Sequence, residues 1–209
     1  MSEMLFREPE GQILEAFRLN RERGWGFEDR VFLELYSQIN FKPIPSPFIQ
    51  ALEICLPAEN GVSAMTRTLY EMWNILKLEH PRNWFWEEIK PDRLRLLGGK
   101  EAAPGIRFQI INFRANLGKA PHQARREGTS PGLGILSIAA LNPEWVRKTG
   151  SKWEPRVWLP GLEMNMPGNP WGWVPRFGKN SNDEISLFAL WGDEGAENFS
   201  VPEIAYFPV

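Results

Sequence analysis

The sequence predicts an α+β fold, in which a helical N-terminal part packs on a mostly antiparallel sheet formed by the C-terminal part. Apolar residues recur at helical spacing in the first part and alternate with polar residues in the second. Glycine and proline together number 9 in residues 1–80 and 27 in residues 81–209, as expected when long helices give way to short strands joined by turns. We therefore expect a helical part, 1–80, and a β-rich part, 81–209, with one short helix near 143–149, within one compact domain.

Two helices are expected at the start of the chain. Residues 9–23 place Ile13, Leu14 and Phe17 on one face, with Gly24 suited to the C-terminal cap. Residues 28–39 repeat apolar side chains at i, i+4 and i+8, after acids suited to a first turn.

A third helix is expected at residues 63–79, which carry an apolar stripe that His80-Pro81 ends. The segment FIQALEICL from Phe48 fits either element. It alternates well enough for a strand, but Ser46-Pro47 resembles a helix start, and we favour a helix.

Strands are expected in the second part. Residues 106–114 alternate with a change of parity that predicts a β-bulge near Ile110, and residues 133–141 resemble a buried strand. Asn142-Pro143 then predicts the short helix, which Gly150 ends. Further strands are expected at 156–159, 185–191 and 203–207, and the Pro- and Gly-rich residues 167–178 predict a surface loop.

Composition excludes several classes of protein. The chain of 209 residues has a single cysteine, Cys55, which excludes a disulfide framework within the chain, and with only two histidines a Cys/His zinc site is not expected. We therefore expect neither a metal nor another cofactor. The first 20 residues carry charges throughout, and the longest apolar run, 133–141, is far shorter than the span of about 20 residues that a membrane helix needs. A cytoplasmic protein without a membrane partner is expected.

Charge is unevenly distributed along the chain. Residues 1–80 have 8 basic and 12 acidic residues, 81–179 have 16 and 8, and 180–209 have none and 6. The basic side chains are densest between residues 107 and 126, where they alternate with aromatic ones in a mixture suited to phosphates and bases; they are Arg107, Arg114, Lys119, Arg125 and Arg126. The alternative interpretation, which we favour, is that these residues are solvated or pair with the acidic tail. The apolar residues at 185–191 predict that this tail packs on the protein.

Ten tryptophans supply the other candidate binding feature. Two pairs lie at i, i+2, in Asn83-Trp84-Phe85-Trp86 and in Pro170-Trp171-Gly172-Trp173, and such pairs share one side of a strand. Exposed indoles would form a stacking platform for a sugar, a base or a partner's proline-rich segment, whereas buried ones fill the core. We expect that Trp171 and Trp173 are not both core residues and that at least one of them lines an exposed groove, with Arg176 nearby to hydrogen-bond a ligand.

Signals for catalysis are weak, and no catalytic residue is assigned. Glu163, Asn165 and Glu154 are one of many carboxylate groupings that 26 acids offer by chance, and neither His80 nor His122 has a nucleophile context. The sequence therefore favours a non-catalytic binding or interaction protein with a protein as its partner. The alternatives are a nucleic-acid binder through residues 107–126 and a carboxylate-dependent hydrolase of carbohydrates or nucleotides.

Overall fold

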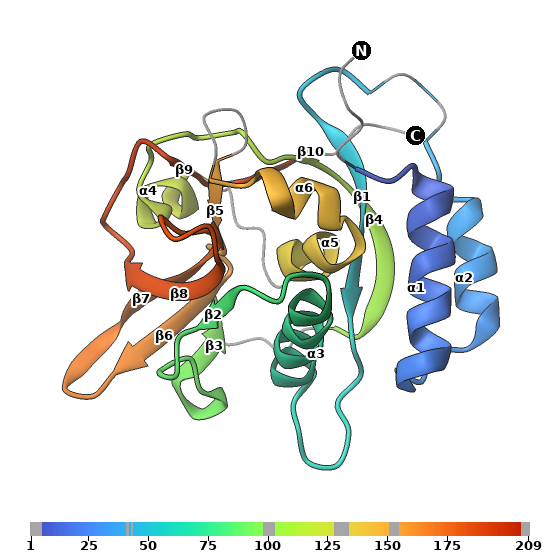
Figure 1. Cartoon of the computed structure of the whole chain (residues 1–209), viewed down its shortest axis with the longest axis horizontal. Helices are drawn as coiled ribbons and strands as arrows, with labels where there is room; N and C mark the ends of the chain where they lie inside the picture. Colours follow the sequence, from blue (N-terminus) through green and yellow to red (C-terminus); the bar gives the residue numbers. More distant parts are fainter. Residues whose placement is uncertain are drawn as a thin grey trace.

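The computed structural model describes residues 6–40, 42, 44–97, 103–127, 134–150 and 155–205. It confirms the α+β prediction, because the longer helices lie in the first part and most strands in the second (Figure 1). No helix within these ranges has the length and apolarity needed to cross a membrane.

The three helices expected from the first part are present as α1 (Pro9–Arg23), α2 (Asp29–Tyr36) and α3 (Ala64–Glu79). Gly24 ends α1 in the left-handed conformation, with φ +64°, and the hydroxyl of Ser63 caps α3 by accepting a hydrogen bond from the Thr66 N–H at 3.2 Å. The buried face of α1 differs from the predicted one. Ile13 is buried, but Leu14 is 60% exposed, and the amide of Gln12 takes a fully buried place.

A three-stranded antiparallel sheet lies beside these helices, in the order β1 (Ile49–Cys55), β4 (Gly105–Asn112) and β10 (Glu203–Ala205). Figure 1 shows α1 and α2 on one face of β1 and β4, and α5 (Gly134–Leu141) with α3 on the other. Both faces are covered, so six of the seven residues of β1 are buried. This explains why residues 48–56 lacked a decisive period, and the helix that we favoured there is wrong.

Side chains from the surrounding helices accept hydrogen bonds from the backbone N–H groups along the free edge of β1. The Leu52 N–H donates to Gln12 Oε1 at 2.8 Å, the Ile54 N–H to Ser137 Oγ at 2.9 Å, and the Leu56 N–H to Thr68 Oγ1 at 2.8 Å. These are alternate residues, as expected for donors that point to the same side of a strand. An edge whose donors are occupied offers no template for another strand.

A larger sheet of seven strands is built from the second part of the chain. Its main path is β2 (Asn83–Phe85), β8 (Ile185–Trp191), β7 (Asn169–Lys179), β5 (Arg156–Trp158) and β9 (Phe199–Ser200), while β6 (Leu162–Met166) pairs with both β7 and β3 (Leu94–Leu96). The β2–β8 and β5–β9 pairs are parallel and the others antiparallel. Because β8 lies between β2 and β7, with Ile185 and Leu187 buried, the acidic C-terminal segment packs on the protein as predicted.

The two faces of this sheet differ. The inner face joins the main core with side chains such as Val157, Phe177 and Leu187. The outer face carries a smaller apolar cluster of Trp158, Val174, Phe199 and Val201, which Ala124 of the short helix α4 (Pro121–Arg126) covers. Helix α4 covers one part of this outer face, and the candidate site lies on the same face beside it.

Three further local predictions are corrected. Residues 134–141 form helix α5, not a strand; every residue of this helix is buried, and a helix that is apolar all round cannot be told from a buried strand by its period. Strand β4 has no bulge, since its register with β1 runs without a shift from Cys55↔Gly105 to Ile49↔Ile111. The apolar residues of β4 change from one side of the strand to the other because helices cover both faces of this sheet.

The third correction concerns residues 167–178, which form a hairpin and strand β7 instead of a loop. The carbonyl of Pro175 accepts a hydrogen bond from the Leu159 N–H at 2.8 Å. An N–H at position 175 would point to the same side of β7 as this carbonyl. On that side the strand paired with β7 changes from β6 to β5. A proline is tolerated there because no regular ladder bond is lost. The predicted short helix is present as α6 (Pro143–Lys148).

Candidate functional site

A pocket of about 70 Å³ opens on the outer face of the seven-stranded sheet. Its wall combines two arginines with aromatic rings and a few polar groups; the residues that define it are Trp84, Arg156, Arg176, Asn180, Phe188 and Phe199. We call this the arginine pocket. One water molecule needs about 10–15 Å³ of such space, so the pocket has room for about five water-sized groups. This is the size of one phosphate or carboxylate group.

Strand pairing brings these side chains together. Arg176 lies opposite Phe188 in the antiparallel β7–β8 pair, and Arg156 lies opposite Phe199 in the parallel β5–β9 pair. Trp84 on the edge strand β2 is paired with Ser186 of β8, which also lines the pocket. Residues directly opposite one another project from the same face of a sheet, so five strands supply one continuous surface.

The guanidinium of Arg176 is held between two rings. Its central carbon lies 4.0 Å from the ring centre of Phe188 and 4.2 Å from that of Phe199. The N–H donors of a guanidinium lie in its plane, so rings on its faces leave the donor edge available. These two cation–π contacts hold the guanidinium of Arg176 at the wall of the pocket.

Arg156 reaches the same pocket across β7. Its Nε donates to the carbonyl of Lys179, and its central carbon lies 5.3 Å from the Phe199 ring centre. The side chain passes over Gly178, where an added Cβ would lie 2.8 Å from Arg156 Cγ. The absence of a side chain at position 178 is what lets Arg156 lie against the sheet.

Two positively charged side chains, Arg156 and Arg176, line the pocket. Burial lowers the pKa of Arg176 to about 10, the charge of Arg156 acts in the same direction, and Glu194 opposes both. Burial also lowers the pKa of Arg156. Within the described ranges, neither guanidinium has an acidic side chain at the ion-pairing distance of 4.0 Å or less. With a pKa of about 10, Arg176 is cationic near neutral pH.

The polar groups at the rim already have partners. The amide of Asn180 donates to Glu184 Oε2 at 2.9 Å, and the hydroxyl of Ser186 donates to the carbonyl of Gly178 at 2.9 Å. Lys179 forms an ion pair with Asp183. The groups that remain to bind a ligand are the donor edges of the two arginines and the exposed part of Trp84. This arrangement suits recognition of an anion.

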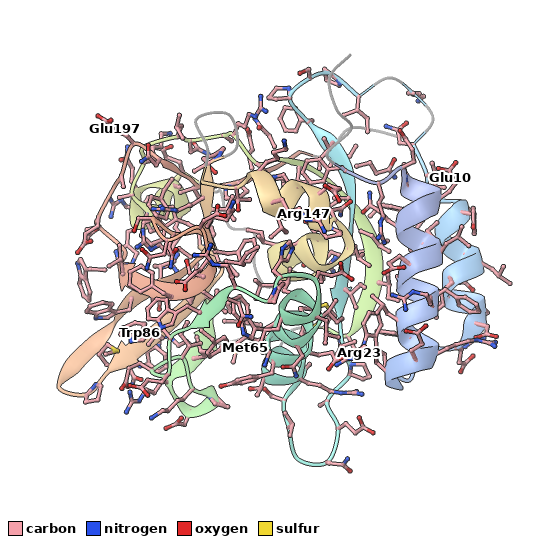
Figure 2. The ribbon with its side chains drawn as sticks, viewed as in Figure 1. Glu10, Arg23, Met65, Trp86, Arg147 and Glu197 are labelled. Atoms are coloured by element: carbon pink, nitrogen blue, oxygen red, sulfur yellow. The ribbon has the colours of Figure 1, made fainter. Side chains whose placement is uncertain are left out.

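The predicted site residues Trp171, Trp173 and Arg176 are separated by the structure. Only Arg176 lines the arginine pocket. Trp171 is partly buried, with the guanidinium carbon of Arg95 4.2 Å from its ring centre. Trp173 packs at the border of the main core, 6.1 Å from Trp86, which Figure 2 labels, and its Nε1 is buried without a hydrogen-bond partner among the described groups.

The predicted basic residues lie on separate elements. Arg107 is on β4, whereas Arg125 and Arg126 are on α4 at the opposite side of the molecule (Figure 1). At least three of the five form ion pairs with acids outside the C-terminal tail: Arg107 with Glu53 at 2.8 Å, Lys119 with Glu127 at 2.6 Å and Arg125 with Glu163 at 2.6 Å. Arg114 lies after β4.

The candidate acid–base residues take structural places. Glu163 is 8% exposed and bound by Arg95 and Arg125; burial alone would raise its pKa, but these hydrogen bonds and charges outweigh it and hold the pKa below its usual value. Glu154 lies outside the described residues. His122 Nδ1 is 3.2 Å from Asp193 Oδ1, and burial raises the pKa of the Cys55 thiol. No group of three or more potential metal ligands occurs among the side chains described.

Sequence reasoning missed Arg156, Phe188 and Phe199 as parts of this site. Phe188 and Arg176 alternate with inward-facing residues on their strands, a signal that the sequence contains. Arg156 and Phe199 meet only through the parallel β5–β9 pairing of segments 43 positions apart, which no local pattern indicates.

Comparisons with known proteins leave the site to be interpreted from its own chemistry. No protein-family model matches the chain, and searches of curated proteins and of solved structures give no significant match.

Proposed function

We propose that this protein is a non-catalytic binding protein that captures an oxyanion, a phosphate-like or carboxylate group, in the arginine pocket. The observation that carries the proposal is the neighbouring pair of partly buried guanidiniums, Arg156 and Arg176, without a carboxylate at ion-pairing distance in the part of the chain that the structure describes.

Physical chemistry favours an anion at this place. Burial removes water from a guanidinium, and the cost is recovered only when an opposite charge replaces that water. Arginine donors are planar and match the two oxygens of a phosphate or carboxylate, and such charge-assisted hydrogen bonds are stronger than neutral ones. A bound anion would also relieve the repulsion between Arg156 and Arg176.

Binding is favoured over catalysis by the side chains that line the pocket. They include no histidine, cysteine or carboxylate that could act as a general base, and the Ser186 hydroxyl is engaged with a backbone carbonyl. The nucleic-acid alternative through residues 107–126 has weaker support, because at least three of its five cations are engaged in ion pairs. A protein partner stays a prediction.

Calorimetric titration of the whole protein with inorganic phosphate, sulfate and acetate at low ionic strength tests the proposal. We expect saturable binding of at least one of these anions and a loss of about tenfold or more in affinity for Arg176→Lys, because lysine keeps the charge but not the planar pair of donors.

Arg95→Lys is the matched control. Arg95 also stacks on an aromatic ring, that of Trp171, but it is paired with Glu163 at 2.8 Å, so its replacement is expected to leave anion affinity unchanged within about twofold. Absence of binding by all three anions, or equal losses in both variants, would reject the arginine pocket as the site.

A further inference from the structure

We propose that the ligand of the arginine pocket is a nucleotide-like molecule, whose phosphate lies against Arg156 and Arg176 and whose flat base stacks on Trp84. This inference rests on the proposed function and adds the chemical class of the ligand. It is carried by the exposed indole at the mouth of the pocket.

Trp84 is the aromatic residue that the pocket leaves open. It is 43% exposed, although tryptophan side chains are mostly buried in folded proteins. It lies on β2, which ends the strand order of the sheet, and no further strand of the described residues pairs with its outer edge. An indole placed beside two cationic donors calls for a ligand that has an apolar, flat part as well as an anion.

The flat groups form a row across the sheet. The Trp84 ring centre lies 5.7 Å from that of Phe188, and the Phe188 ring centre lies 4.0 Å from the guanidinium carbon of Arg176. These contacts bring Trp84 to within about 10 Å of Arg176, as expected for side chains two strands apart at about 4.8 Å per strand. A base on Trp84 and a phosphate at Arg176 would then be separated by a span that one sugar can bridge.

The size of the pocket also indicates a ligand in two parts, a phosphate inside the pocket and a base outside it. The pocket volume of about 70 Å³ suits the phosphate alone, and the base would lie outside it on the exposed face of Trp84. A neutral sugar would use the indole but leave both arginines without an anion, and an inorganic anion would leave the indole unused. A base joined to a phosphate uses both.

Calorimetric titration with four probes separates the parts: inorganic phosphate, ribose 5-phosphate, adenosine and adenosine 5′-monophosphate. We expect the monophosphate to bind about tenfold or more tightly than ribose 5-phosphate, since stacking of a base on an aromatic side chain has about that effect on affinity. Adenosine alone is expected to bind more weakly than the monophosphate, because the charged contacts are absent.

Variants assign the effect to Trp84. Trp84→Ala is expected to lower the affinity for the monophosphate to that for ribose 5-phosphate without changing the affinity for inorganic phosphate, and Trp84→Phe to restore most of it. Tyr36→Ala, which removes an aromatic ring of similar exposure, 40%, on α2, is the control and is expected to change neither.

Two results would overturn the inference while leaving the proposed function intact: equal affinities for the monophosphate and ribose 5-phosphate, or equal losses for every phosphate probe in Trp84→Ala. If no phosphate-bearing probe and no simple anion binds, the proposed function itself fails. Circular dichroism of each variant checks that the fold is retained, and if Trp84→Ala unfolds it is replaced in the comparison by Trp84→Leu, which keeps an apolar side chain but has no ring.

Discussion

Gly178 and Arg156 meet where β7 passes beneath the arginine pocket: a Cβ built on Gly178 would lie 2.8 Å from Cγ and 3.1 Å from Cα of Arg156. The backbone of Gly178 has φ +144°, a conformation that other residues rarely adopt. One glycine thus serves both the strand and the site, because it adopts this backbone conformation within β7 and leaves the space in which Arg156 lies.

Replacing Gly178 by alanine is expected to displace Arg156 and therefore to weaken phosphate binding about tenfold, while lowering the free energy of unfolding by about 1–3 kcal/mol through backbone strain and crowding. Calorimetric titration and urea denaturation measure the two effects. Gly168→Ala is the control: φ is +76° there, but nothing lies within 4 Å of an added Cβ, so stability should fall and binding should not. Equal binding by the two variants would show that Arg156 does not depend on Gly178.

The edge of β1 provides a second prediction. In Gln12→Leu the Leu52 N–H loses its acceptor and the Gln50 carbonyl loses a donor, both in the interior, so the free energy of unfolding should fall by about 1–3 kcal/mol. Gln123→Leu, at an exposed position on α4, should cost less than about 0.5 kcal/mol.

Amide hydrogen exchange locates the same effect within the strand. The Leu52 amide should exchange faster in Gln12→Leu, whereas the Ile54 amide, held by Ser137, should keep its protection apart from the global change in stability. Similar acceleration at both amides would mean that Gln12 stabilises the protein as a whole instead of this edge.

The comparison of sequence with structure shows which features depend on local pattern. Helices α1 and α3 were predictable because each carries its own period and its own end signals, Gly24 and Ser63. Residues 134–141 and β1 were not, because burial on all sides removes the alternation that distinguishes a helix from a strand. Strand β7 was mistaken for a loop because the tolerance of Pro175 depends on a change of neighbouring strand that the sequence does not contain.

In the candidate site too, some residues could be predicted from local sequence and others only from strand pairing. Arg176 was predicted as a binding residue from its place beside an aromatic segment, and its proximity to Phe188 follows once β7 and β8 are paired. The contribution of Arg156 could not be predicted without knowing that β5 lies between β7 and β9 in the sheet. Local patterns identify candidate side chains, whereas their convergence is a property of long-range strand order.

His80 provides the last prediction, on the dependence of stability on pH. It lies at the C-terminal end of α3, 8% exposed, and its Nε2 has no hydrogen-bond partner among the groups that the structure describes. Burial lowers the pKa of His80 to about 4, and the positive charges of Arg147 and Lys179 add to the effect.

The unfolded chain therefore takes up a proton at His80 near the ordinary pKa of about 6.5, while the folded protein resists protonation until about pH 4, so stability must fall as the pH is lowered through this window. The linkage predicts a loss of about 2 kcal/mol between pH 7 and pH 5. Urea denaturation at the two pH values measures the loss, and in His80→Gln, which does not titrate, it should be smaller by about that amount. The same dependence in both proteins would assign it to other groups, such as the ion-paired Glu163, whose lowered pKa also makes stability fall in acid but in a lower pH range.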